Sequence, residues 1–199
     1  MFERKKRWIR SRSWIPILIL ILTKTALGAS GYQDSPQRLL NSGKQAFSNG
    51  NYASAENILR RAVREGKALN FSDSETALAL ADLGNLLLTQ GQYQESEAFL
   101  EQSVALIRAS TTADRRQLPI VMGNLGKLYQ KTGRFKQSQE ILNEALKLSA
   151  AVLREFPIYI ADLHNNLGVL HLETGDTKQA ERSFKKALAL IEVGRNDDD

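Results

Sequence analysis

The amino-acid sequence predicts an all-α protein, an α-solenoid of four helix-turn-helix units. The first observation is a glycine that recurs at intervals of 41, 42 and 42 residues, at Gly43, Gly84, Gly126 and Gly168. A second glycine follows each of these at a constant distance, at Gly50, Gly91, Gly133 and Gly175. In addition, no stretch alternates apolar and polar residues as a strand would. Repetition at this period is typical of stacked units, so the functional question becomes which partner the chain binds.

Each unit reads as a helix, a short turn and a second helix. In the third unit, one face of the first helix carries Met122, Leu125, Gly126 and Tyr129, and one face of the second carries Ser138, Ile141, Leu142 and Ala145. A glycine inside a helix costs about 1 kcal/mol relative to alanine, so we expect these glycines to allow close approach of the paired helix. Small residues face the same contact: Ala55, Ser96, Ser138 and Ala180. The second set of glycines suits the left-handed conformation of a helix C-terminal cap.

The units resemble the tetratricopeptide repeat (TPR) family, whose signature is W-x2-L-G-x2-Y followed by A-x3-F and a further A. The matching positions are Met122, Leu125, Gly126, Tyr129, Ser138, Leu142 and Ala145 in the third unit, and His164, Leu167, Gly168, His171, Ala180, Phe184 and Ala187 in the fourth. The usual unit has about 34 residues. The longer unit here, with Asn124-Leu125-Gly126 and Asn166-Leu167-Gly168, is similar to the kinesin light chain type. The family signature also ends in a proline, which is missing from all four units. The resemblance implies a right-handed superhelix with a concave, peptide-binding surface.

Capping signals and composition divide the chain into segments. Ser35-Pro36 suits a helix start, and Ser72 with Glu75 fits a capping box. We predict a signal peptide or membrane anchor at 1–28, a linker at 29–35, the solenoid at 36–193 and a disordered acidic tail at 194–199. The four units of the solenoid are predicted at about 36–70, 71–113, 114–156 and 157–193.

The N-terminal residues predict export. Six cations within residues 1–13 precede an apolar run at 14–22, and small residues follow, an order typical of a secretory signal peptide. An uncleaved anchor is the alternative, although a membrane-spanning helix needs about 20 apolar residues and residues 14–29 include Pro16 and Lys24. Because cations stay on the cytoplasmic side, both alternatives place the repeats outside the cytoplasm, as a periplasmic, secreted or membrane-anchored domain.

Composition excludes several functions. The whole chain has a formal charge of +5, but residues 1–28 contribute +6. The remaining residues therefore carry no excess of positive charge that would favour binding to nucleic acid. The absence of cysteine excludes disulfides, thiol catalysis and cysteine metal sites. His164 and His171 lie on one helix face, but they occupy the family's packing positions, so we expect no metal and no cofactor. No nucleophile-elbow, zinc-protease or phosphate-loop motif occurs, so we predict that the protein is not an enzyme.

The candidate site is the face that the first helices turn toward the concave side, where the family binds extended peptides. The candidate peptide-binding residues are Asn41, Lys44, Asn85, Asn124, Lys127, Lys131, Asn165 and Asn166. An asparagine amide can donate to a peptide carbonyl and accept from a peptide N–H at once, and lysines favour an acidic group. The alternative is that the asparagines support helix packing and the lysines face solvent.

These observations predict an exported, non-catalytic scaffold that binds an extended segment of another protein in its concave groove. The alternative is a structural protein that self-assembles end to end through units one and four. The last helix, about 177–193, would expose Phe184, Leu188 or Ile191 where a fifth unit would pack. The expected partners are therefore another protein or a second copy of the chain, and a membrane only through an uncleaved N-terminal segment.

Overall fold

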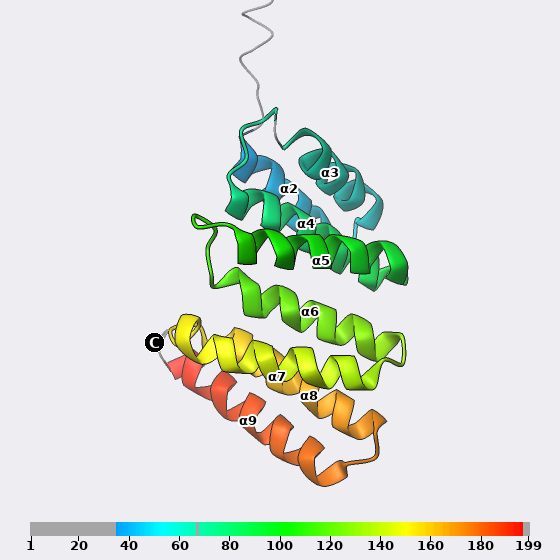
Figure 1. The fold of residues 1–199 in the computed structure, drawn as a ribbon, viewed down its shortest axis with the longest axis vertical. Coiled ribbons are helices and arrows are strands. Elements are labelled where there is room, and N and C mark those ends of the chain that lie inside the picture. Colours follow the sequence, from blue (N-terminus) through cyan, green and yellow to red (C-terminus); the bar gives the residue numbers. More distant parts are fainter. Residues whose placement is uncertain (1–34, 67, 197–199) are drawn as a thin grey trace, which may run out of the picture. The chain divides into compact units, whose positions relative to one another are not determined.

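The computed structural model describes residues 35–66 and 68–196 (Figure 1). The chain divides into two parts, residues 1–34 and 35–199, and the described residues belong to the second. Its helices are α2 (Pro36–Ser48), α3 (Tyr52–Glu65), α4 (Asp73–Thr89), α5 (Tyr93–Ala109), α6 (Gln117–Lys131), α7 (Phe135–Val152), α8 (Pro157–Glu173) and α9 (Thr177–Asn196). The prediction of an all-α fold of paired helices is confirmed for this part of the chain.

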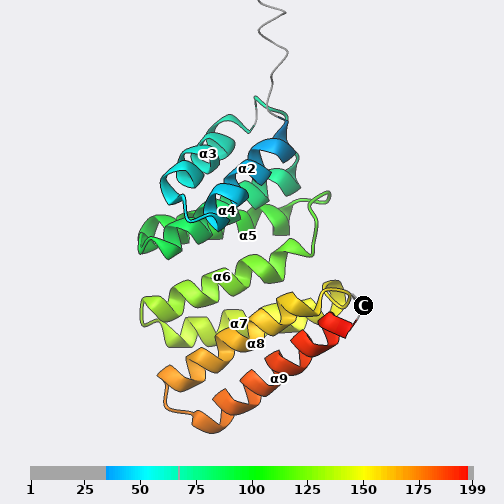
Figure 2. The ribbon, with the colours of Figure 1, turned by 180° about the vertical axis from the view of Figure 1, so that it is seen from behind.

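The helices follow one another through the stack in chain order (Figures 1 and 2). The four units are α2 with α3, α4 with α5, α6 with α7, and α8 with α9, and each unit packs against the next. The largest core cluster extends from α4 to α8, so the central units share one hydrophobic interior. Among residues 35–66 and 68–196, no helix is long and apolar enough to cross a bilayer, and the predicted signal or anchor segment lies outside the described residues.

The helix ends follow the capping chemistry that the sequence predicts. Gly50, Gly91, Gly133 and Gly175 all have positive φ, between 74° and 83°. At the end of α4 the Gly91 N–H bonds the Leu88 carbonyl, and the Gln92 N–H bonds the Leu87 carbonyl. This pattern closes the helix with a left-handed glycine. At the start of α4, Ser72 and Glu75 form the predicted capping box.

The glycines inside the helices allow the close packing that the repeat register predicts. An added Cβ at Gly84 would lie 2.7 Å from Leu100, and one at Gly126 would lie 2.5 Å from Leu142. The small residues of the second helices have a further role, because the Ser96 hydroxyl donates to the Gly84 carbonyl at 2.7 Å. Ser138 makes the same bond to Gly126 at 2.9 Å. These hydroxyls tie the two helices of a unit together at the point of closest approach.

The C-terminal helix is longer than predicted. The sequence predicts that the solenoid ends at residue 193, whereas α9 continues to Asn196. Gly194 lies within this extension, and a glycine so near a helix end interrupts few intrahelical hydrogen bonds. Residues 197–199 of the predicted tail lie outside the described residues.

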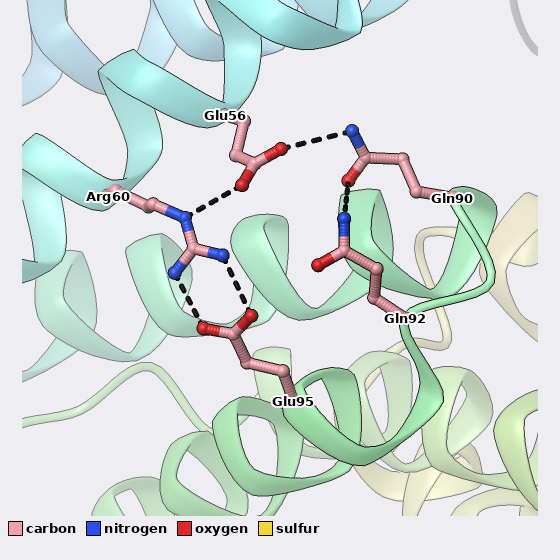
Figure 3. A network of polar contacts seen from close by, with 5 residues as sticks. All are labelled: Glu56, Arg60, Gln90, Gln92 and Glu95. Carbon is pink, nitrogen blue, oxygen red and sulfur yellow. Dashed lines mark hydrogen bonds and ion pairs between the residues drawn. The ribbon is translucent and has the colours of Figure 1, made fainter.

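Charged side chains join unit one to unit two (Figure 3). Arg60 of α3 donates to both carboxylate oxygens of Glu95 of α5, at 2.6 and 2.8 Å, and to Glu56 at 2.8 Å. The Gln90 amide, at the end of α4, donates to the other oxygen of Glu56 at 3.1 Å. Glu95 and Glu56 therefore have lowered pKa values, chiefly because Arg60 donates hydrogen bonds to both. Bidentate pairs of this kind add directional specificity to the packing of one unit on the next.

The next junctions use different residues at related positions. Arg134 of unit three donates to both oxygens of Glu97 of unit two, at 2.6 and 2.8 Å. Its guanidinium also lies 4.4 Å from the centre of the Tyr129 ring. Between units three and four, the Gln130 amide donates to the Asn166 backbone carbonyl at 2.7 Å. Each junction thus combines apolar packing with a polar contact.

Candidate functional site

The first helices of the units form the inner layer of the stack. Each of them contacts the next first helix, in the series α2, α4, α6 and α8, whereas the described residues of α3, α5, α7 and α9 make no contact between one second helix and another. Spacing is therefore tighter along the first helices, and the stack curves toward them. We call α2, α4, α6 and α8 the inner helices and the others the outer helices.

Equivalent residues of the inner helices form rows across the concave side, which we call the groove face. The rows are Gln37, Leu78, Ile120 and Asp162; Asn41, Asp82, Asn124 and Asn166; Lys44, Asn85, Lys127 and Val169; and Ser48, Thr89, Lys131 and Glu173. Residues four or seven apart on one helix share a face, so each inner helix contributes one residue to every row. Seven of the eight predicted site residues belong to these rows, and Asn165 is exposed beside Asn166.

Two of the three predicted lysines have acidic neighbours on the adjacent inner helix. Lys44 of α2 forms an ion pair with Asp82 of α4, with Nζ 3.7 Å from Oδ2. Lys127 of α6 lies near Asp162 of α8; partial burial raises the pKa of that carboxyl, and Lys127 opposes the rise. Lys131 is exposed at the end of α6. The groove face therefore carries both signs of charge, which weakens the expectation that its lysines select an acidic group.

Asp82 is the unexpected member of the second row, because the other units have asparagine there. Its side chain is only 23% exposed, and burial raises the pKa of the carboxyl to about 6, with Lys44 acting in the opposite direction. Among the described residues, no donor lies within hydrogen-bond distance of its Oδ2. An incompletely paired carboxylate in such a position costs free energy while it is ionised.

Some of the predicted asparagines bond other residues of the chain, and others have a side chain that is free to bind a ligand. The Asn41 side chain accepts from Gln37 at 3.0 Å, and the Asn166 amide donates to the Gly123 carbonyl at 3.5 Å. Asn166 thus lies at the contact between α6 and α8, as the packing alternative expects. Asn124 is half-buried on α6, and its side chain has no hydrogen-bond partner in the part of the chain that the structure describes. Of the asparagine row, Asn124 is the member whose side-chain amide makes no hydrogen bond within the described residues, so both its oxygen and its nitrogen can serve a ligand.

A cavity of about 220 Å³ opens at one end of the groove face, and we call it the groove pocket. Its apolar walls are Leu78 of α4, Ile120 of α6, Leu153 and Phe156 of the loop between α7 and α8, and Tyr159 of α8. Phe156 and Tyr159 are 37% and 40% exposed, with ring centres 6.3 Å apart. Ligand pockets for whole small molecules are usually about 300–1,000 Å³, so this cavity suits a single side chain.

Polar groups line the rim of the groove pocket. The Arg116 guanidinium lies 5.5 Å from the centre of the Phe156 ring and bonds Asp114 Oδ2 at 2.8 Å. The hydrogen bond from Arg116 holds the pKa of Asp114 below its ordinary value. The Gln117 Oε1 atom is buried, and no donor among the described residues reaches it. A buried acceptor without a donor costs about 1–3 kcal/mol, and a ligand N–H would relieve that cost.

The loop that carries this rim is held in place by hydrogen bonds. The Arg115 guanidinium donates to the carbonyls of Ile107 at 2.9 Å and Ser110 at 3.0 Å. The Asp114 N–H donates to the Ser74 hydroxyl of α4 at 2.7 Å. The rim is therefore ordered before any ligand arrives, which lowers the entropy cost of binding.

The sequence analysis does not predict the groove pocket, because several of its lining residues lie where the predicted units meet, including Asp114, Arg116 and Phe156. Two signals point to it. Leu78 and Ile120 lie two helical turns before Asn85 and Lys127, on the same faces, and they are apolar where most residues of the face are polar. Phe156 and Tyr159 are large apolar residues at the start of a unit, outside the repeat signature.

Burial lowers the pKa of His164, as expected for a packing position. No group of three histidine, aspartate or glutamate residues that could hold a metal occurs within residues 35–66 and 68–196. The groove pocket, the Asn124 amide and the unpaired Gln117 oxygen together offer an apolar recess beside donors and acceptors.

Comparison with known proteins agrees with this architecture. The tetratricopeptide repeat model matches residues 37–109 and 117–192. A sequence search of the curated proteins finds no match. Three similar solved structures are BtubC (BKLC) from P. vanneervenii, MamA, and the Rap conjugation gene regulator of the plasmid pLS20 in complex with the Phr* peptide.

The three likenesses differ in extent. For BtubC the TM-score is 0.66 at 19% identity, over 79% of this chain and 62% of that one. For MamA the TM-score is 0.57 at 20% identity, over 87% of this chain and 86% of that one. For the Rap regulator the TM-score is 0.66 at 18% identity, over 76% of this chain and 41% of that one. The chain thus spans less than two thirds of BtubC, and identities this low concern the fold alone.

Proposed function

The chain belongs to the tetratricopeptide repeat family, whose members generally act as protein–protein interaction scaffolds, and from this premise we propose that it binds an extended segment of another protein along its groove face. The observation that carries the proposal is the groove pocket beside Asn124. A preformed apolar recess with unpaired polar groups next to it is the usual form of a recognition site. The role is one of binding, without catalysis.

The spacing of the two features suits an extended peptide. Ile120, in the pocket wall, and Asn124 are one helical turn apart on α6, so their Cβ atoms are about 5–6 Å apart. An extended chain advances about 3.3 Å per residue. A peptide with one side chain in the pocket therefore brings the backbone of its second neighbour to the Asn124 amide, which donates and accepts at once.

The pocket walls favour an apolar or aromatic side chain in the partner. Phe156 and Tyr159 can pack against an aromatic ring, and the neighbouring Gln117 oxygen accepts from a backbone or side-chain N–H. Because Lys44 and Lys127 have acidic neighbours, the proposed segment does not need to be acidic. The Rap regulator, whose structure contains the Phr* peptide, provides a precedent for peptide binding on a related fold.

We also propose that the repeats act outside the cytoplasm. The argument comes from the sequence of residues 1–28, whose cationic start, short apolar run and small residues fit an export signal. On this proposal the partner is an envelope or secreted protein, or a domain of one, that presents an unfolded segment.

Selection from a displayed library of random peptides tests the groove proposal. We expect the chain to enrich peptides that share one apolar or aromatic position. Ile120→Lys places a charge in the pocket wall and should weaken a selected peptide about tenfold or more, since an unpaired buried charge is costly. Binding is measured by isothermal titration calorimetry. Phe135→Ala is the control, because it removes an exposed aromatic side chain at the start of α7, outside the groove pocket. Peptides that bind Ile120→Lys as well as the unaltered chain would contradict the proposal.

A further inference from the structure

The last unit exposes a surface whose equivalents are covered in preceding units. Leu172 of α8 and Leu188 of α9 are 52% and 57% exposed. Their equivalents in unit two, Leu88 and Val104, are 5% and 8% exposed and belong to the core cluster that includes α6. We call the exposed surface the α9 face; its residues are Leu172, Glu181, Phe184, Lys185, Leu188 and Ile191. The first five of these line a hollow of about 390 Å³, in the position where a following inner helix would pack.

The polar part of the α9 face also corresponds to a junction. Glu181 has the register of Glu56 and Glu97. Both of those carboxylates accept hydrogen bonds from the following unit, Glu56 from Gln90 (Figure 3) and Glu97 from Arg134. Glu181 instead pairs with Lys185 of its own helix at 2.6 Å, with both side chains largely exposed. The α9 face therefore has the apolar and acidic features of a unit junction, and no following unit covers it among residues 35–66 and 68–196.

The other end of the stack does not supply the missing surface. The inner helices α4, α6 and α8 have leucine at two buried positions that face the preceding unit, namely Leu83 and Leu86 in α4. The equivalent residues of α2 are Ser42 and Gln45, both exposed. A second copy that stacked end to end would therefore place polar side chains against Leu188, which burial disfavours.

We propose that two copies of the chain pair through their α9 faces, antiparallel and related by a two-fold axis. In such an isologous contact the same patch serves both partners, so the polar surface of α2 does not matter. An axis beside the peptide bond between Leu188 and Ala189 brings the two Leu188 side chains together. Phe184 then lies next to Ile191 of the second copy.

The charges of α9 favour this antiparallel arrangement. Lys185 and Glu192 lie the same number of residues before and after that axis, and both are exposed on the side of the helix that carries Leu188. Antiparallel pairing therefore places Lys185 of each copy opposite Glu192 of the other, twice in the dimer. A parallel pairing would place like charges opposite each other. Exposed ion pairs contribute little affinity, so we assign them the role of setting the register.

Sedimentation equilibrium of the whole chain over a range of concentrations tests the pairing. We expect a monomer–dimer equilibrium for the unaltered chain, and a rise of about tenfold or more in its dissociation constant for Leu188→Glu. Lys185→Glu and Glu192→Lys should each weaken the dimer. The double variant should restore it, because the two exchanged charges then face each other across the two-fold axis with opposite signs. Restoration within a single sequence is specific to an isologous contact.

Lys186→Glu is the matched control. It makes the same charge change as Lys185→Glu, but on the side of α9 that faces His164. It should leave the dissociation constant unchanged, and thermal unfolding should show that every variant is folded. The groove variant Ile120→Lys should also leave the dimer intact, which separates this proposal from the groove proposal. A monomer at all concentrations, a dimer that Leu188→Glu leaves unchanged, or a double variant that fails to recover would each overturn the proposal.

Discussion

Gly126→Leu should lower the free energy of unfolding by about 3 kcal/mol and the melting temperature by about 6–12 °C. A Cβ at this position would lie 2.5 Å from both Cγ and Cδ2 of Leu142, which is fully buried on α7. The two helices cannot separate cheaply, because the Ser138 hydroxyl bonds the Gly126 carbonyl at the same point. The added side chain must therefore displace the core of unit three.

Thermal and urea denaturation measure the effect of Gly126→Leu. Asn143→Leu is the matched control, because it adds the same side chain at an exposed position of α7, and it should change stability by less than about 0.5 kcal/mol. Gly126→Ala adds only the clashing atom and should fall between the two. An unchanged melting temperature for Gly126→Leu would contradict the close packing on which the repeat register depends.

Asp82→Asn should stabilise the protein at neutral pH by about 2–3 kcal/mol, since the pKa is raised by about two units at 1.36 kcal/mol each. The folded-state pKa of about 6 lies above the ordinary value of 3.8, so ionised Asp82 disfavours the folded state. As the pH falls through 6, the folded protein takes up the proton before the unfolded chain does, and the unaltered protein gains stability. The gain in the free energy of unfolding from Asp82→Asn should therefore be complete above about pH 6 and lost below about pH 4.

Urea denaturation between pH 4 and pH 8 measures this difference. Asparagine is the residue that Asn41, Asn124 and Asn166 provide at the equivalent positions, so the substitution suits the local backbone. Asp162→Asn is the control, because the pKa of Asp162 is also raised but its side chain is more exposed than that of Asp82, so the change should have a smaller effect in the same direction. A loss of stability at pH 7 on Asp82→Asn would mean that the pair with Lys44 contributes more than burial costs.

The repeat and the helix ends are predictable from the sequence because their causes are local. A positive φ at Gly133 follows from the need to end α6, and the capping box at Ser72 involves residues three apart. The periodic glycines likewise mark the closest contact within one unit, between two helices that a short turn joins. These features depend on spacing along the chain, which the sequence displays directly.

The groove is less predictable because its properties arise between units. Whether Lys44 reaches Asp82, or whether Asn166 faces Gly123, depends on how far one unit is displaced from the next. The groove pocket requires three inner helices and two loops to converge, and each contributes a residue that is ordinary in its own unit. Asp82 could be flagged by its position among asparagines, but its burial could not be read from the sequence.

Site-specific photo-crosslinking in the source cells tests the central claim, that the groove face binds a segment of another protein. A photoreactive phenylalanine analogue at Tyr159 places the probe in the groove pocket, and the same analogue at Phe135 is the control, because both residues are aromatic and 40% and 36% exposed. We predict a discrete crosslinked protein from Tyr159, weakened by Ile120→Lys, and none from Phe135. The same products from both positions, or products from Phe135 alone, would contradict the account.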